Sequence, residues 1–171
     1  MNAPYRARLN REPSAFRKAA VPIGSVLIGS MTPLLPIVAS APVLPPFGLM
    51  VLICWQLLRP GIWPVWAGVP FGMFDDILSG QPVGSAVLLW SVVLIALDLI
   101  EQRYIWRNYW QDWFIAAVAL IFALAGGLAI NNFLVSDTRL SVLFPQMILA
   151  IFTYPLVLRV VARLDHIRLK R

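Results

Sequence analysis

Long apolar runs alternate with short polar breaks along the whole chain. The breaks carry proline, glycine or charged residues, which end one helix and allow the chain to turn. A helix needs about 20 apolar residues to cross a bilayer core of about 30 Å. The pattern therefore predicts an all-α integral membrane protein with six transmembrane helices. These predicted spans cover residues 21–40, 43–58, 62–78, 83–100, 113–135 and 140–161.

Basic residues predict the orientation of this six-helix domain, residues 21–163. Residues 1–20 and 164–171 are polar and rich in arginine and lysine, and we expect both to be cytoplasmic tails. With six spans between them, Arg139 is the one basic residue of 14 on the outer side. Because basic residues concentrate on the cytoplasmic side, this bias predicts that both ends lie inside.

The composition supports a membrane protein. Apolar residues make up 60% of the chain and charged residues 13%, whereas soluble domains have about half and about a quarter. The net charge of +6 would suggest a nucleic-acid partner in a soluble protein. Here the basic residues lie in tails and short loops, where they set topology, so we expect no nucleic-acid partner.

Residues 102–112 mix basic and aromatic side chains between the fourth and fifth spans. Such a composition suits the headgroup boundary, with an aromatic belt and contacts to anionic lipids at the cytoplasmic face. A helix that docks a partner is the alternative. The side chains concerned are Arg103, Tyr104, Trp106, Arg107, Tyr109 and Trp110.

Two adjacent carboxylates, Asp75 and Asp76, interrupt the third span. Charged groups in a span are costly and usually have a role. Asp76 also falls within a four-residue repeat of glycines, whose flank would let another helix approach closely. The repeat consists of Gly68, Gly72, Gly80 and Gly84.

An enzyme or a proton pathway fits this pair of carboxylates poorly. Adjacent helical residues point about 100° apart, so both cannot hold one ligand well. The middles of the other spans lack the polar chain that a proton pathway needs. We therefore interpret one carboxylate as capping or packing at a helix crossing, where a protonated group could donate a hydrogen bond. The other would reach water or a partner.

The fifth span has a second small-residue flank. Ala119, Ala123 and Gly127 are spaced by four, and such a flank also admits a neighbouring helix. Asn131 and Asn132 follow near the far end of the span, where amides can bond across helices.

Residues 72–84, GMFDDILSGQPVG, resemble the signature of the bacterial rod-shape-determining membrane protein family MreD. That signature has a glycine, an aspartate four residues on, then Ser-Gly and a further glycine. Asp75 is an addition, because an apolar residue is more usual there. Residues 46–55, PFGLMVLICW, are similar to the family's second helix. The matching signature positions are Gly72, Asp76, Ser79, Gly80 and Gly84.

The resemblance implies a non-enzymatic scaffold in the inner membrane, within the elongasome that directs peptidoglycan synthesis and maintains rod shape. Family members pair with the bitopic protein MreC, and through it connect MreB filaments to a glycan polymerase and a transpeptidase. The implied fold is similar to the substrate-binding subunit of energy-coupling-factor vitamin transporters. No cofactor, metal or catalytic residue comes with the resemblance.

Two hypotheses follow from these residues. In the first, the small-residue flank of the third or fifth span receives one partner helix, with Asp76 fixing the register. In the second, the chain is the substrate-binding subunit of a small-molecule transporter, which requires a polar, aromatic-lined cavity near the outer face. The candidate residues for that cavity are Asp75, Asp76, Gln81, Asn131 and Asn132.

Overall fold

The structure is a computed structural model that describes residues 15–34, 44–103, 108–134 and 140–169. Within these ranges it consists of α-helices and short 3₁₀ segments, without a β-strand, so the all-α prediction is confirmed. The 3₁₀ segments are η1 (Thr32–Leu34), η2 (Val65–Ala67) and η3 (Leu140–Leu143). The six α-helices are α1 (Ala15–Ser30), α2 (Phe47–Leu58), α3 (Gly68–Ser79), α4 (Ser85–Arg103), α5 (Tyr109–Leu134) and α6 (Phe144–Leu169).

Helix boundaries differ from the prediction at both ends of the chain and before α3. α1 begins inside the predicted N-terminal tail, and α6 continues into the predicted C-terminal one. α3 begins at Gly68, because residues 62–64 form bends and an extended step before η2. Three predicted features lie outside the described residues: the end of the first span, the middle of the aromatic connector and the loop with Arg139 that is predicted to be on the outer side.

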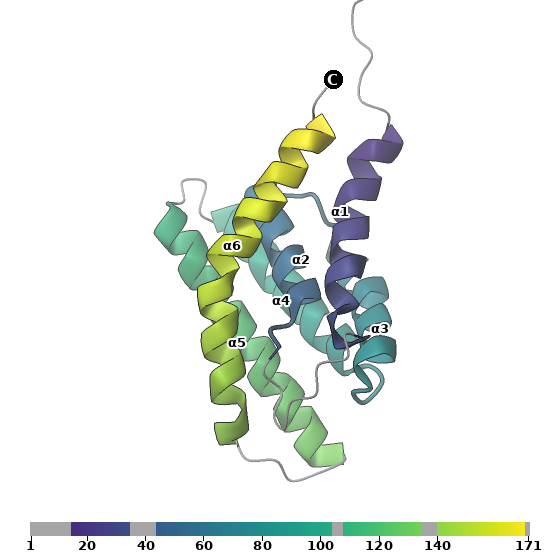
Figure 1. Ribbon diagram of the computed structural model, residues 1–171, viewed down its shortest axis with the longest axis vertical. Coiled ribbons are helices and arrows are strands. Elements are labelled where there is room, and N and C mark those ends of the chain that lie inside the picture. The colour runs from purple at the N-terminus through teal and green to yellow at the C-terminus, as the bar shows by residue number, and fades with distance from the viewer. Residues whose placement is uncertain (1–14, 35–43, 104–107, 135–139, 170–171) are drawn as a thin grey trace, which may run out of the picture.

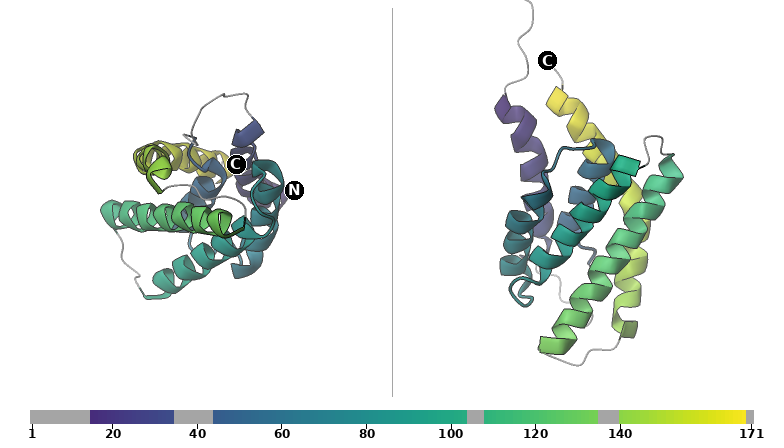
Figure 2. Two further views of the ribbon diagram at one scale, coloured as in Figure 1. Left: turned by 90° about the horizontal axis from the view of Figure 1, so that it is seen from below. Right: turned by 180° about the vertical axis from the view of Figure 1, so that it is seen from behind.

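The first and last helices meet at one end of the molecule. Figure 1 shows the start of α1 and the end of α6 side by side, while the turn between α3 and α4 lies toward the opposite end. The view from behind in Figure 2 shows the same arrangement. The described part of the chain therefore begins and ends at the same end of the helix bundle, while the number of membrane crossings stays a prediction.

Helix α2 is the centre of the fold. It contacts α1, α4, α5 and α6, and a helix that is apolar on all sides is expected in such a buried position. Its lone cysteine, Cys54, is buried and free. The buried residues of α2 are Gly48, Leu49, Met50, Leu52, Ile53, Cys54, Trp55, Gln56 and Leu57.

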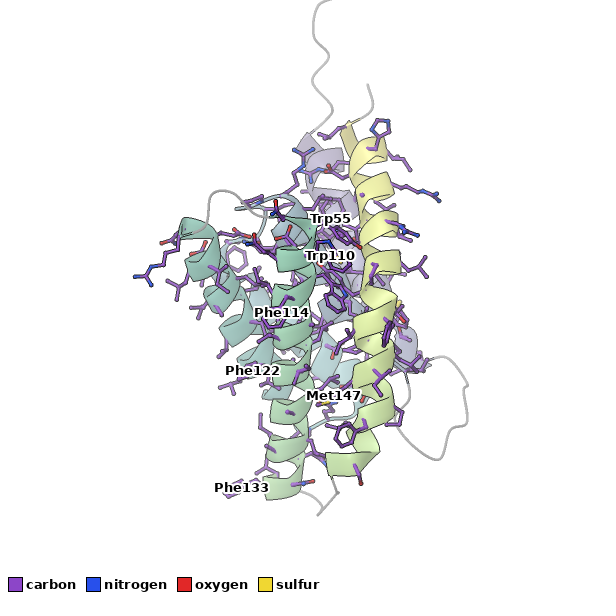
Figure 3. All side chains as sticks on the ribbon, turned by 90° about the vertical axis from the view of Figure 1, so that its left-hand side faces the viewer. Trp55, Trp110, Phe114, Phe122, Phe133 and Met147 are labelled. Carbon is purple, nitrogen blue, oxygen red and sulfur yellow. The ribbon has the colours of Figure 1, made fainter. Side chains whose placement is uncertain are left out.

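The outer surface is apolar. Helices α4, α5 and α6 are long and apolar enough to cross a membrane, and α2 is a shorter apolar helix. Along α5, the side chains of Trp110, Phe114 and Phe133 are 73%, 64% and 89% exposed, and Figure 3 shows them spread from one end of the helix to the other. Soluble monomers rarely expose apolar surface on this scale, so the chain has the character of a membrane protein.

Helices α3 and α4 approach each other unusually closely. A Cβ added to Gly68 would lie 2.7 Å from the Cα of Ser91, and one added to Gly72 would lie 2.6 Å from the Cα of Val87. The predicted close approach at this glycine flank is therefore present. The neighbour is α4 of the same chain, however, so the hypothesis that this flank receives a partner helix is wrong.

We expect Gly72→Ala to destabilise the protein. Its methyl group would push apart two helix backbones, at a cost of about 1–3 kcal/mol. The matched control is Gly24→Ala in α1, where an added Cβ meets nothing within 4 Å and better helix propensity should be neutral or stabilising. Thermal unfolding in detergent measures both. Equal midpoints for Gly72→Ala and the unmodified protein would contradict the close packing.

Candidate functional site

The two adjacent aspartates have different environments. Asp76 is 2% exposed, and its carboxylate accepts three hydrogen bonds from the start of the next helix. Oδ2 accepts from the Gly84 N–H at 2.7 Å, while Oδ1 accepts from the Ala86 N–H at 2.8 Å and the Ser85 hydroxyl at 3.0 Å. Asp75 is only half-buried and faces a cavity.

Asp76 acts as a cap that α3 supplies to α4. The first N–H groups of a helix have no partner within it, and the positive end of the helix dipole favours a negative group there. Gly84 and Ala86 flank the first residue of α4, so the carboxylate satisfies donors at this end. Capping, one of the roles predicted for a carboxylate at a helix crossing, is therefore the role of Asp76, whereas the predicted donation does not hold because both of its oxygens accept.

The turn between α3 and α4 explains the remaining glycines of the signature. Gly80, which ends α3, has a φ of +65°, and Gly84 has a φ of +97°. Backbones in this left-handed region strongly favour glycine. Ser79 has its hydroxyl buried, with no hydrogen-bond partner in the part of the chain that the structure describes. The signature thus builds one compact helical hairpin.

A cavity of about 370 Å³ lies beside this hairpin. It is formed where the ends of α3 and α5 meet the starts of α2, α4 and α6, at the end of the molecule away from the start of α1 and the end of α6. Polar groups are contributed by Asp75, Gln81, Asn131 and Gln146. The apolar lining consists of Pro46, Leu49, Ala86, Leu89, Trp90, Ala123, Leu124, Gly127, Leu128 and Leu143.

The cavity brings together part of the predicted polar set. Asp75, Gln81 and Asn131 line it, whereas Asp76 and Asn132 are not among its lining residues. Gln146 was not predicted, and its amide nitrogen donates to the Leu44 carbonyl at 2.7 Å. The sequence offered one indication of this role, which is that Gln146 is a polar residue near the start of an otherwise apolar helix.

The small-residue flank of the fifth span serves two sites. Ala123 and Gly127 line the cavity, while Ala119 lines a separate groove of about 380 Å³ between α4 and α5. This α4–α5 groove is wholly apolar. Its lining consists of Val92, Val93, Ala96, Leu97, Ile100, Phe114, Ile115, Val118, Ala119 and Phe122.

Sequence analysis missed an ion-pair cluster at the other end of the molecule. Arg59, after α2, donates from Nε and Nη2 to Asp165 Oδ2 of α6 at 3.0 and 2.8 Å. Arg168 lies 3.5 Å from the second oxygen of Asp165, and its guanidinium lies over the Trp55 ring. The Asp165–Arg168 spacing on one helix face was the available signal. The cluster ties α2 to α6.

Across the described ranges, no group of three or more His, Cys, Asp or Glu side chains is placed to hold a metal ion. Comparison of the chain with protein-family models, curated proteins and solved structures finds no match. The resemblance to MreD therefore depends on the quoted residues, and the likeness to the transporter subunit fold stays a prediction.

We expect Asp76→Asn to destabilise the protein more than Asp75→Asn. Asparagine keeps one acceptor oxygen, but its amide nitrogen cannot accept from the α4 donors, so the cost should be about 1–3 kcal/mol. Asp75 accepts no backbone hydrogen bond from α4, so the same change there should cost less. Unfolding titrations in mixed micelles give both free energies, and equal losses would refute the capping role.

Proposed function

We propose that this chain is a non-enzymatic scaffold subunit of the bacterial cell-wall elongation complex, of the MreD type, in the inner membrane. It holds an MreC-like bitopic protein, and through it the MreB filaments and the two peptidoglycan synthases, so that the cell keeps a rod shape. The observation that carries the proposal is the hairpin of residues 72–84. In it, the signature residues Gly72, Asp76, Gly80 and Gly84 each have a structural task.

The geometry of Asp76 favours a scaffold over an enzyme. A catalytic or metal-binding carboxylate needs an oxygen that can reach a substrate or ion. Both oxygens of Asp76 are occupied by the start of α4. The costly buried charge therefore stabilises one helix arrangement, which is the property that a binding platform needs.

The partner's transmembrane helix, in this proposal, lies in the α4–α5 groove. The glycine flank of α3 is covered by α4, and Ala123 and Gly127 face the cavity. The groove is the remaining surface that carries a small residue of the predicted flank, Ala119, between exposed aromatic side chains. Helix association in a bilayer depends mainly on close packing, which a groove provides.

Affinity purification of the tagged chain from gently solubilised membranes tests both the function and the groove. We expect an MreC-like bitopic protein to co-purify with the unmodified chain. Ala96→Trp fills the groove and should reduce recovery by about tenfold, equivalent to about 1.4 kcal/mol of affinity. Ala129→Trp, on an exposed part of α5 outside the groove, is the matched control and should retain the partner.

The outcomes separate the two parts of the proposal. Retention of the bitopic partner by Ala96→Trp would move the contact elsewhere while leaving the scaffold function intact. Recovery of an ATPase and a coupling subunit in place of an MreC-like protein would overturn the scaffold function.

The second candidate, the substrate-binding subunit of a small-molecule transporter, is favoured by one observation. The cavity of about 370 Å³ has polar groups from Asp75, Gln81 and Asn131 and an aromatic wall at Trp90. Its volume is within the range of small-molecule sites, about 300–1,000 Å³. The same purification distinguishes this candidate, because its partners would be an ATPase and a coupling subunit.

A further inference from the structure

Asp75 brings an acidic group into an otherwise mostly apolar cavity. Among the lining residues that the structure describes, none is a lysine or an arginine. The Ser30 hydroxyl of α1 lies beside the Asp75 carboxyl, in a contact outside strict hydrogen-bond geometry. An acidic side chain at this depth is costly unless an opposite charge accompanies it. A ligand that fills the cavity should therefore carry a positive charge that pairs with the negative charge of Asp75.

The neighbouring carboxylate, Asp76, does not contribute a charge to the cavity. Asp76 is held by the start of α4 and does not line the cavity. The capping of α4 therefore does not use Asp75, whose side chain lines the cavity instead.

The remaining lining suits an apolar molecule with one positive group. Leu49, Leu89, Leu124 and Leu128 supply an apolar wall. Trp90, which is 4% exposed, adds an aromatic surface. Carboxylates and aromatic rings are the groups that proteins use to bind ammonium ions.

We propose that this cavity binds a small organic cation, a protonated amine on an apolar body. The ammonium group pairs with the Asp75 carboxylate, and the body packs against the leucine wall. Asp75 would repel an anion, and a neutral ligand would leave the negative charge of Asp75 without a partner. The site is separate from the α4–α5 groove, so it stands whether or not a partner helix binds there.

Calorimetry on the full chain in phosphatidylcholine nanodiscs tests the site, with benzylamine as the probe. Benzyl alcohol has nearly the same shape without the charge. We expect saturable binding of benzylamine and none of benzyl alcohol. Asp75→Asn should weaken benzylamine binding on the order of 10- to 100-fold, because asparagine keeps an acceptor oxygen but removes the negative charge that pairs with the ammonium group.

Two further variants keep the result interpretable. Asp98→Asn makes the same chemical change on α4, at a carboxylate that accepts from Gln102 outside the cavity, and should leave binding unchanged. Gly127→Leu fills the cavity without touching Asp75, and should abolish binding. A Cβ at Gly127 would meet Gln81 Oε1 at 3.7 Å, an ordinary contact that the helix tolerates. Thermal unfolding checks that each variant is folded.

Ammonium groups occur both in soluble amines and in the ethanolamine headgroup of a phospholipid. Nanodiscs that contain phosphatidylethanolamine distinguish these sources: competition with benzylamine identifies the headgroup as the occupant, and its absence identifies a soluble amine. Binding of benzyl alcohol equal to that of benzylamine would overturn the proposal. So would unchanged benzylamine affinity in either folded variant, Asp75→Asn or Gly127→Leu, or no saturable binding by the unmodified chain.

Discussion

The carboxylate of Asp76 at the start of α4 is the interaction on which the membrane-embedded architecture depends. It accepts hydrogen bonds from backbone N–H groups, which lipid tails cannot do. These hydrogen bonds also join α3 to α4 at their shared turn. The glycines at 68 and 72 then let the two helices pack along their length. The cavity follows from this arrangement, because α3 supplies its acidic group while α4 supplies Trp90 and part of the apolar wall.

The centre of the bundle adds a second constraint, which acts at the opposite end. α2 is short and buried by four other helices, so its length need not match the thickness of a bilayer by itself. The pair between Arg59 and Asp165 holds its far end against α6. The hairpin and this pair thus fix the two ends of the bundle independently of each other.

The apolar runs predicted the order and approximate extent of the helices, because proline, glycine and charge interrupt them at the real turns. The predicted helix boundaries were wrong where charged residues or proline, and not the hydropathy of the segment, determine where a helix begins or ends. α6 extends through Arg168, whose charge suits a helix C-terminus. The apolar segment before α3 contains Pro64 and remains non-helical in part. The glycine spacing predicted a close approach but not which helix approaches. Asp165 was missed because its partner is 106 residues away.

The position of Asp76 and its donors within one hairpin has a consequence for biogenesis. The acceptor and its backbone donors are only 8 and 10 residues apart in the chain. These bonds can therefore form as soon as α3 and α4 have been synthesised, before α5 and α6 leave the ribosome. The hairpin can enter the lipid as a unit with the oxygens of this carboxylate already hydrogen-bonded, which lowers the cost of moving the group out of water.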